Sequence, residues 1–158
     1  MFTITSSAFA DGARIPARHT CDADDLSPPL KWADPPPGTE SFVLIVDDPD
    51  APDPAAPKRI WVHWLRYNIQ REVRDLAEGA GNPDGPAAQE AITDAGTHGY
   101  HGPCPPIGRH RYFFRIFALD GLLSSLGDSA RRADLERAMD GHVLGSAVLM
   151  GTYERNQR

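Results

Sequence analysis

The sequence of 158 residues is long enough for one domain with a single sizeable core. Its formal net charge of −6 argues against general binding to nucleic acid or anionic membranes, which requires a basic surface. No apolar run approaches the roughly 20 residues of a membrane span, and Met1–Ser6 lacks the features of a secretory signal. We therefore expect one cytoplasmic domain over residues 1–158, with no nucleic-acid partner and no stable membrane insertion.

The two cysteines, Cys21 and Cys104, are far apart in the sequence and do not have the spacing of a metal site. Because the chain has no recognisable export signal, we predict that both are reduced thiols. A disulfide between them is the alternative.

Short strands dominate the first half of the chain. Phe2–Ser6 alternates apolar and hydroxyl residues, as a strand does, and Ser27–Trp32 is a short extended piece because of its prolines. Ser41–Asp47 is a nearly continuous apolar run, which predicts a central strand. Trp61–Ile69 alternates again, which places His63 on one face and Trp64 on the other.

The second half is predicted to be strand-rich as well. Residues 70–98 carry turn residues and little periodicity, so they are expected to be a long surface connection. A buried strand follows at Arg111–Leu119 and a last strand at about Ser146–Tyr153. Between them the apolar spacing predicts one helix, with Asp134 as N-cap and an inner face made of Leu135, Ala138, Met139, His142 and Val143.

Proline and glycine (15 and 14 residues) cluster between the apolar runs, which is typical of many short strands joined by turns. The predicted fold class is therefore all-β: a β-sandwich with one or two peripheral helices.

The stretch from Tyr100 to Phe113 combines a stiff loop with the start of a buried strand. Its first half is rich in proline and glycine, and His110 and Tyr112 follow two residues apart. In an extended segment both side chains lie on one face. A polar pair at the mouth of an apolar strand, beside a rigid loop, predicts a preformed pocket for a small ligand.

Further polar residues stand at the ends of other predicted strands. Asp48 and Asp50 flank Pro49 where a buried strand ends, and His63 lies near the start of its strand. If the strand ends meet, the carboxylates orient the imidazoles and favour their protonated form, which suits a phosphate or carboxylate ligand. Each feature alone is more often structural: Asp-Pro-Asp is a common turn, and a lone strand histidine is more often a core residue.

Other chemistries remain open at this stage. Asp48, Asp50, His63, His101 and His110 can be imagined as a metal site, although they have no ligand spacing. Cys104 beside a histidine can be imagined as a nucleophile, although its flanking prolines favour a structural role. No nucleophile elbow, phosphate loop or dinucleotide-binding motif is present. We therefore predict no catalytic residue, no metal and no cofactor.

Several of these motifs, in this order, resemble the phosphatidylethanolamine-binding protein (PEBP) family, which includes Raf kinase inhibitor protein. The resemblance lies in Asp48–Pro52, Trp61–His63, Gly102–Pro106 and Gly108–Tyr112, and it covers essentially the whole chain. The segments Thr20–Asp22, Ser27–Leu30, His142–Leu144 and Gly151–Tyr153 resemble the bacterial and archaeal branch in particular.

The resemblance implies a Greek-key β-sandwich with a small anion pocket for phosphate or phosphoethanolamine-type groups. The implied ligand-binding residues are Asp48, Asp50, Pro52, Trp61, His63, Gly102, Cys104, Pro105, Pro106, His110 and Tyr112. Cys104 stands where animal members of the family have a glycine. The resemblance also implies a homodimer, and a protein partner such as a kinase or a protease.

Our preferred hypothesis is a non-enzymatic, regulatory protein that binds a small anion. One alternative is a hydrolase acting on a phosphate or acyl ester, with His63 or His110 as general base. A second alternative is a protein-interaction scaffold in which the pocket has lost its use.

Overall fold

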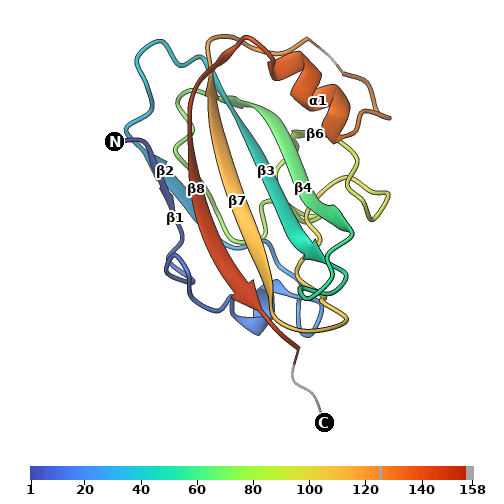
Figure 1. Cartoon of the computed structure of the whole chain (residues 1–158). Helices are drawn as coiled ribbons and strands as arrows, with labels where there is room; N and C mark the ends of the chain where they lie inside the picture. Colours follow the sequence, from blue (N-terminus) through green and yellow to red (C-terminus); the bar gives the residue numbers. More distant parts are fainter. Residues whose placement is uncertain (125, 156–158) are drawn as a thin grey trace.

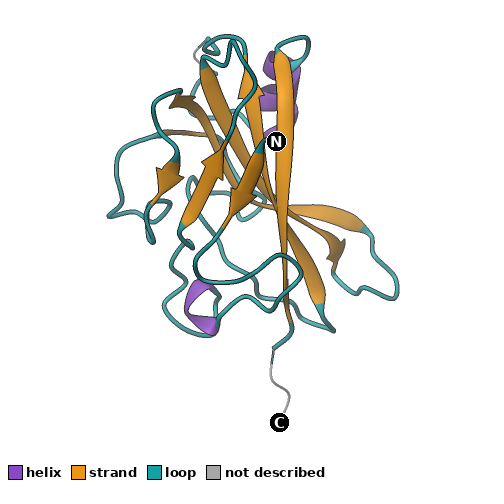
Figure 2. Ribbon diagram, turned by 90° about the vertical axis from the view of Figure 1, so that its left-hand side faces the viewer, coloured by secondary structure: helices purple, strands orange, loops and turns teal. Residues whose placement is uncertain are grey.

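The computed structural model describes residues 1–124 and 126–155, and in that part of the chain strands predominate over helices. The strands form two antiparallel sheets (Figures 1 and 2). The smaller sheet has the order β1-β2-β5, with β1 at Thr3–Thr5, β2 at Leu30–Ala33 and β5 at Asp75–Leu76. The predicted all-β sandwich is confirmed.

The larger sheet has the order β6-β4-β3-β7-β8. Its strands are β6 (Gln89–Glu90), β4 (Arg59–Gln70), β3 (Ser41–Ala51), β7 (His110–Leu119) and β8 (Val143–Tyr153). The short strands β5 and β6 lie within residues 70–98, which the sequence predicted as surface connection. They are two residues each, too short to produce a recognisable period.

The central strand β3 is buried on both faces, which explains its continuous apolar sequence. Phe42, Leu44 and Val46 belong to the core between the two sheets. Val43 and Ile45 belong to a second cluster on the other face of the larger sheet, which α1 helps to cover (Figure 1).

The helix α1 spans Arg132–Met139, so it is shorter than predicted, and His142 and Val143 lie outside it. Gly141 has a φ of 82°, a left-handed conformation that ends helices, and β8 begins two residues later at Val143. Asp134 is not the N-cap but lies one turn inside, where its carboxylate accepts the Arg131 N–H at 2.9 Å. None of the helices in the described segments is both long and apolar enough to cross a bilayer.

The strand β4 does not alternate as the sequence predicted. Val46 pairs with Trp64 and Asp47 pairs with Val62, which leaves His63 as an extra residue in a β-bulge. As a result, Val62 and Leu65 lie in one core cluster and Trp64 in the other. A bulge redirects a side chain, and here the redirected side chain is His63.

Candidate functional site

A cavity of about 470 Å³ lies where the end of β3 and the beginnings of β4 and β7 meet two loops. These strand ends lie at the end of the molecule at which β8 ends (Figure 1). The loops are residues 17–25, which begin with a 3₁₀ turn at Ala17–His19, and residues 101–106.

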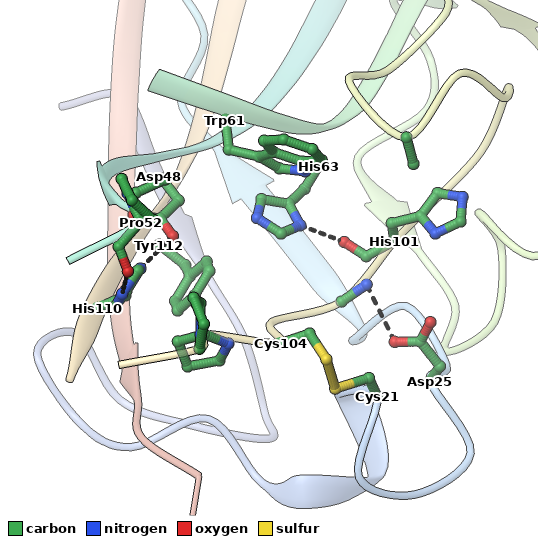
Figure 3. A pocket seen from close by; sticks show the side chains of 15 residues that line it. Cys21, Asp25, Asp48, Pro52, Trp61, His63, His101, Cys104, His110 and Tyr112 are labelled. Carbon is green, nitrogen blue, oxygen red and sulfur yellow. Dashed lines mark hydrogen bonds and ion pairs between the residues drawn. A yellow bond between two sulfur atoms is a disulfide. The ribbon is translucent and has the colours of Figure 1, made fainter. Parts of the chain in front are cut away.

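Ten of the eleven residues predicted for the pocket line this one cavity (Figure 3). They are Asp48, Pro52, Trp61, His63, Gly102, Cys104, Pro105, Pro106, His110 and Tyr112. The eleventh, Asp50, is not among the lining residues. The rest of the lining consists of Cys21, Asp25, Ala51, Ala95 and His101.

Asp48 and His110 form a buried pair at one side of the cavity. The Asp48 Oδ2 atom lies 2.6 Å from Nδ1 of His110, and the two side chains are 4 % and 1 % exposed. The other oxygen of Asp48 accepts the backbone N–H of Asp50 at 2.7 Å. Asp48 is therefore fixed in orientation and fixes the imidazole in turn.

The second nitrogen of His110 is also engaged. Its Nε2 lies 2.9 Å from the carbonyl oxygen of Ile107 and 3.1 Å from that of Pro52, so it must carry a proton to donate. The contact between Nδ1 and the carboxyl group of Asp48 needs a proton as well. The pair is therefore either an imidazolium with a carboxylate or an imidazole with a carboxylic acid, and its net charge is zero in both forms.

His63 is oriented by the backbone and not by a carboxylate, in contrast to the prediction. Its Nδ1–H donates to the carbonyl oxygen of His101 at 2.6 Å. Its Nε2 atom makes no hydrogen bond to the described residues, and no buried side-chain nitrogen is left unpaired among them, so Nε2 is accessible from the cavity. Burial lowers the pKa of His63, an effect that the His101 carbonyl and Asp48 only partly oppose.

Tyr112 lies between the two histidines. Its ring centroid is 5.3 Å from that of His63, edge to face, and 6.3 Å from that of His110, nearly parallel. Burial, and then the negative charge of Asp48, raise the pKa of Tyr112 far above its usual value. The hydroxyl therefore keeps its proton and remains a donor. The predicted shared face of His110 and Tyr112 on one strand is confirmed.

Asp50 is engaged outside the cavity lining. Its two oxygens accept from Nε and NH2 of Arg111 at 3.0 and 2.9 Å, and one of them also accepts the Arg111 backbone N–H at 2.9 Å. These hydrogen bonds lower the pKa of Asp50. The expectation that both acids serve the imidazoles therefore does not hold, because Asp48 orients one imidazole and Asp50 neutralises an arginine.

The prediction of two reduced thiols is wrong: Cys21 and Cys104 form a disulfide. It joins the two loops that border the cavity (Figure 3). The same loops also meet through backbone contacts, with the Cys21 N–H donating to the carbonyl of Pro103 at 3.1 Å. The cysteines are 83 positions apart, so sequence spacing alone could not reveal that they meet.

Asp25 and His101 are lining residues absent from the predicted set. One Asp25 oxygen accepts the Gly102 N–H at 3.0 Å, and burial raises the pKa of Asp25. Nothing in the sequence distinguishes Asp25 from its acidic neighbours Asp22 and Asp24. His101 could have been found, because it lies within the stretch from Tyr100 to Phe113 that the sequence analysis singled out.

The loop after Gly102 offers very few backbone donors. Pro103, Pro105 and Pro106 have no N–H, so Cys104 carries the only amide hydrogen in that run. This N–H donates to none of the described residues. The cavity thus combines rigid proline walls with polar groups that include the Cys104 N–H, the Tyr112 hydroxyl and Nε2 of His63.

Among the described residues, no group of three or more histidine, cysteine or acidic side chains is arranged to hold a metal ion.

The fold and the cavity define a class: β-sandwich proteins with a small polar cavity at one end of the sheets. The sequence profile of the phosphatidylethanolamine-binding protein family matches residues 5–154. The chain belongs to this family.

Relatives and solved structures agree with this assignment. A UPF0098 protein of Methanothermobacter thermautotrophicus is 47 % identical, over 96 % of this chain and 98 % of the relative. The crystal structure of a putative PEBP homologue from Chlamydia trachomatis has a TM-score of 0.89 at 41 % identity, covering 98 % of each chain. That of E. coli YbcL, described as a new member of the mammalian PEBP family, has a TM-score of 0.87 at 30 % identity, covering 98 % of this chain and 99 % of YbcL.

Proposed function

We propose that this protein binds a small phosphate-bearing or other anionic ligand in the cavity and acts as a regulatory binding protein. The observation that carries the proposal is a set of three polar groups from the lining of one rigid cavity: the Cys104 N–H, the Tyr112 hydroxyl beside the Asp48 carboxyl group, and Nε2 of His63. The first two are donors, and His63 becomes a third when it takes up a proton. Three donors on residues that line one cavity fit the oxygens of a phosphate.

Binding fits this site better than turnover. Within the described segments, the side chains that line the cavity include no serine, threonine or lysine, and both cysteines are oxidised. The alcohol, thiol and amine nucleophiles that serve most often in covalent catalysis are therefore missing from this lining. The neutral Asp48–His110 pair holds the wall of the cavity without repelling an anion.

The test is a titration with inorganic phosphate, phosphoethanolamine and ethanolamine, followed by the ring NMR signals of His63 and His110. We expect saturable shifts with the two phosphate ligands, strongest for His63, and none with ethanolamine. An absence of shifts at millimolar phosphate near pH 6 would contradict the proposal. Tyr112→Phe should weaken binding, whereas Tyr67→Phe, which changes a buried tyrosine outside this cavity, should not.

One observation favours the hydrolase alternative. Nε2 of His63 is open to the cavity and burial favours its neutral form, as a general base requires. His110 does not meet this requirement, because both of its nitrogens are engaged. Phosphate and acyl esters should be assayed with the wild type and with His63→Asn; turnover that disappears in the variant would favour the enzyme.

We further propose a homodimer, formed through β8 at the edge of the larger sheet. Residues Val143–Leu149 carry no charge, and Val143, Leu144 and Val148 are exposed. An uncharged edge strand invites pairing with another strand, and two antiparallel copies of one strand are self-complementary. Light scattering should give twice the chain mass, and Val148→Lys should give monomers. A monomeric wild type at micromolar concentration would count against the dimer.

We place the protein in the cytoplasm as part of this proposal. A disulfide in that compartment is more often redox-active than structural. Trapping of thiols in intact cells, followed by mass spectrometry of the peptides that contain Cys21 and Cys104, would measure how much disulfide forms there. A protein partner, such as a kinase or a protease, remains a proposal, and pull-downs with pocket variants would test it.

A further inference from the structure

The Cys21–Cys104 disulfide is both exposed and part of the cavity wall. Both cysteines are solvent-exposed, and both line the cavity that we propose for an anion (Figure 3). Thiol–disulfide exchange requires that a thiolate reach one of the two sulfur atoms, so exposure within a binding cavity creates a place for this reaction.

Cys104 links the two features of the site. Its backbone N–H is one of the proposed anion donors, and its Sγ belongs to the disulfide. A ligand whose anionic group is held at this N–H therefore lies next to the bond. The cavity of about 470 Å³ is large enough for a small molecule that carries both an anionic group and a thiol.

The loops do not depend on the disulfide alone to stay together. The Cys21 N–H donates to Pro103, the Gly102 N–H donates to Asp25, and the Tyr100 hydroxyl donates to the carbonyl of His19 at 2.7 Å. Opening the disulfide leaves these contacts in place. The reaction is therefore compatible with a folded protein.

We propose that the cavity is a site of thiol–disulfide exchange that selects small anionic thiols. This inference rests on the proposed anion binding. The thiolate of the bound molecule attacks Sγ of one cysteine, a new S–S bond forms, and the Cys21–Cys104 bond breaks. The electron pair of that bond leaves on the other cysteine as a thiolate. A second thiol can then release the first as a symmetrical disulfide and leave both cysteines reduced.

The exchange also regulates the cavity. While the mixed disulfide persists, the attached molecule fills the space in which a free anion would bind. Anion binding and exchange are therefore mutually exclusive.

A preference for anionic thiols is the opposite of what the net charge of the whole protein favours. With a net charge of −6, the surface repels anionic thiols on average. Asp25 adds a carboxylate to the lining. A faster reaction with an anionic thiol therefore has to come from donors in the cavity and not from the general field.

The test compares 2-mercaptoethanesulfonate, which is anionic, with 2-mercaptoethanol, which is neutral and similar in size. Rates of reduction of the native protein, divided by thiolate concentration, are measured at constant ionic strength. We expect the sulfonate to react at least about tenfold faster, the scale on which a charged cleft concentrates a ligand. Inorganic phosphate should slow the sulfonate reaction and leave the mercaptoethanol reaction unchanged.

Two matched variants complete the experiment. Tyr112→Phe should reduce the preference for the sulfonate, whereas Tyr67→Phe should preserve it, and both keep the disulfide. Mass spectrometry after acid quenching should find the mixed disulfide on Cys21 or Cys104.

Equal rates, or a faster reaction with mercaptoethanol, would overturn the inference. If the NMR titration still detects phosphate binding in that case, the proposed function stands and only the exchange site falls. If neither phosphate binding nor a preference is found, both fall. A preference without phosphate binding would support the exchange site and contradict phosphate as the ligand.

Discussion

The Asp48 carboxyl group lies 2.6 Å from one nitrogen of the His110 ring, while the other nitrogen of that ring faces two carbonyl oxygens. Both contacts of the ring need a proton, so the pair carries two protons between its nitrogen and oxygen atoms. A carboxylate and a neutral imidazole would carry only one. Asn at position 48 can accept the Asp50 N–H and donate to a neutral His110. Asp48→Asn should therefore lower the free energy of unfolding by only about 1 kcal/mol.

Asp48→Ala should cost far more, about 3–5 kcal/mol, because it removes one partner of a buried pair. Urea denaturation measures both changes. The ¹⁵N shifts of His110 should show a neutral ring protonated at Nε2 in Asp48→Asn. Equal losses in the two variants would contradict this account of the pair.

The stability of the protein should depend on pH through His63. Burial lowers the pKa of His63 below the usual histidine value of 6.5, so the unfolded chain binds more protons than the folded one once the pH falls to about that value. The free energy of unfolding should therefore decrease as the pH falls from about 6.5 to the folded-state pKa, by at most about 1.4 kcal/mol per pH unit.

His63→Asn keeps a donor for the His101 carbonyl and removes the titration. The difference between wild type and variant should shrink when sulfate is added, because an anion in the cavity favours protonated His63. If the free energy of unfolding changes with pH in the same way for the wild type and His63→Asn, His63 does not titrate as described.

Asp50 should have little influence on ligand binding. It pairs with Arg111, whose side chain is half exposed, and it does not line the cavity. Because Asp50 itself is buried and accepts charged hydrogen bonds from Arg111, Asp50→Asn should cost about 1–3 kcal/mol of stability. It should leave the phosphate affinity unchanged by NMR titration. A loss of phosphate affinity as large as that caused by Tyr112→Phe would contradict this prediction and indicate that Asp50 contributes to binding.

Much of the fold could be predicted from local pattern. Continuous apolar sequence in β3 and alternation in β7 gave the correct strands, and the shared face of His110 and Tyr112 followed from period-2 geometry. The redirection of His63 could not be predicted, because a bulge depends on register with β3. The separation of Asp50 from Asp48 depends on Arg111, and the disulfide depends on a meeting of distant loops. These are long-range relationships that no local pattern records.

The disulfide should contribute strongly to stability. It closes a loop of 83 positions, for which the chain-entropy account gives about 4–5 kcal/mol. Reduction, or the double change Cys21→Ser and Cys104→Ser, should lower the free energy of unfolding by up to that amount. A denaturation midpoint that is the same with and without reductant would contradict the prediction.

Gly102 lies where the two cavity loops touch. A Cβ at this position would collide with the carbonyl of His19 and the carboxylate of Asp25. Gly102→Ala should therefore cost about 1–3 kcal/mol and weaken phosphate binding, because it pushes the loops apart. Gly121→Ala is the matched control, since a Cβ there meets open space. Equal stability of the two variants would show that the loops can move apart without a loss of folding free energy.

The bond between Cys21 and Cys104 encloses β2, β3, β4, β5 and β6 in a covalent ring, with β1 on one tail and β7, α1 and β8 on the other. A protease that cuts once inside this ring, for instance in the segment before β6, leaves both fragments attached to each other. Such a nicked chain would migrate as one piece on a denaturing gel until a reductant separates it. Limited digestion, followed by a denaturing gel with and without reductant, can therefore show whether the disulfide is formed in protein isolated from cells.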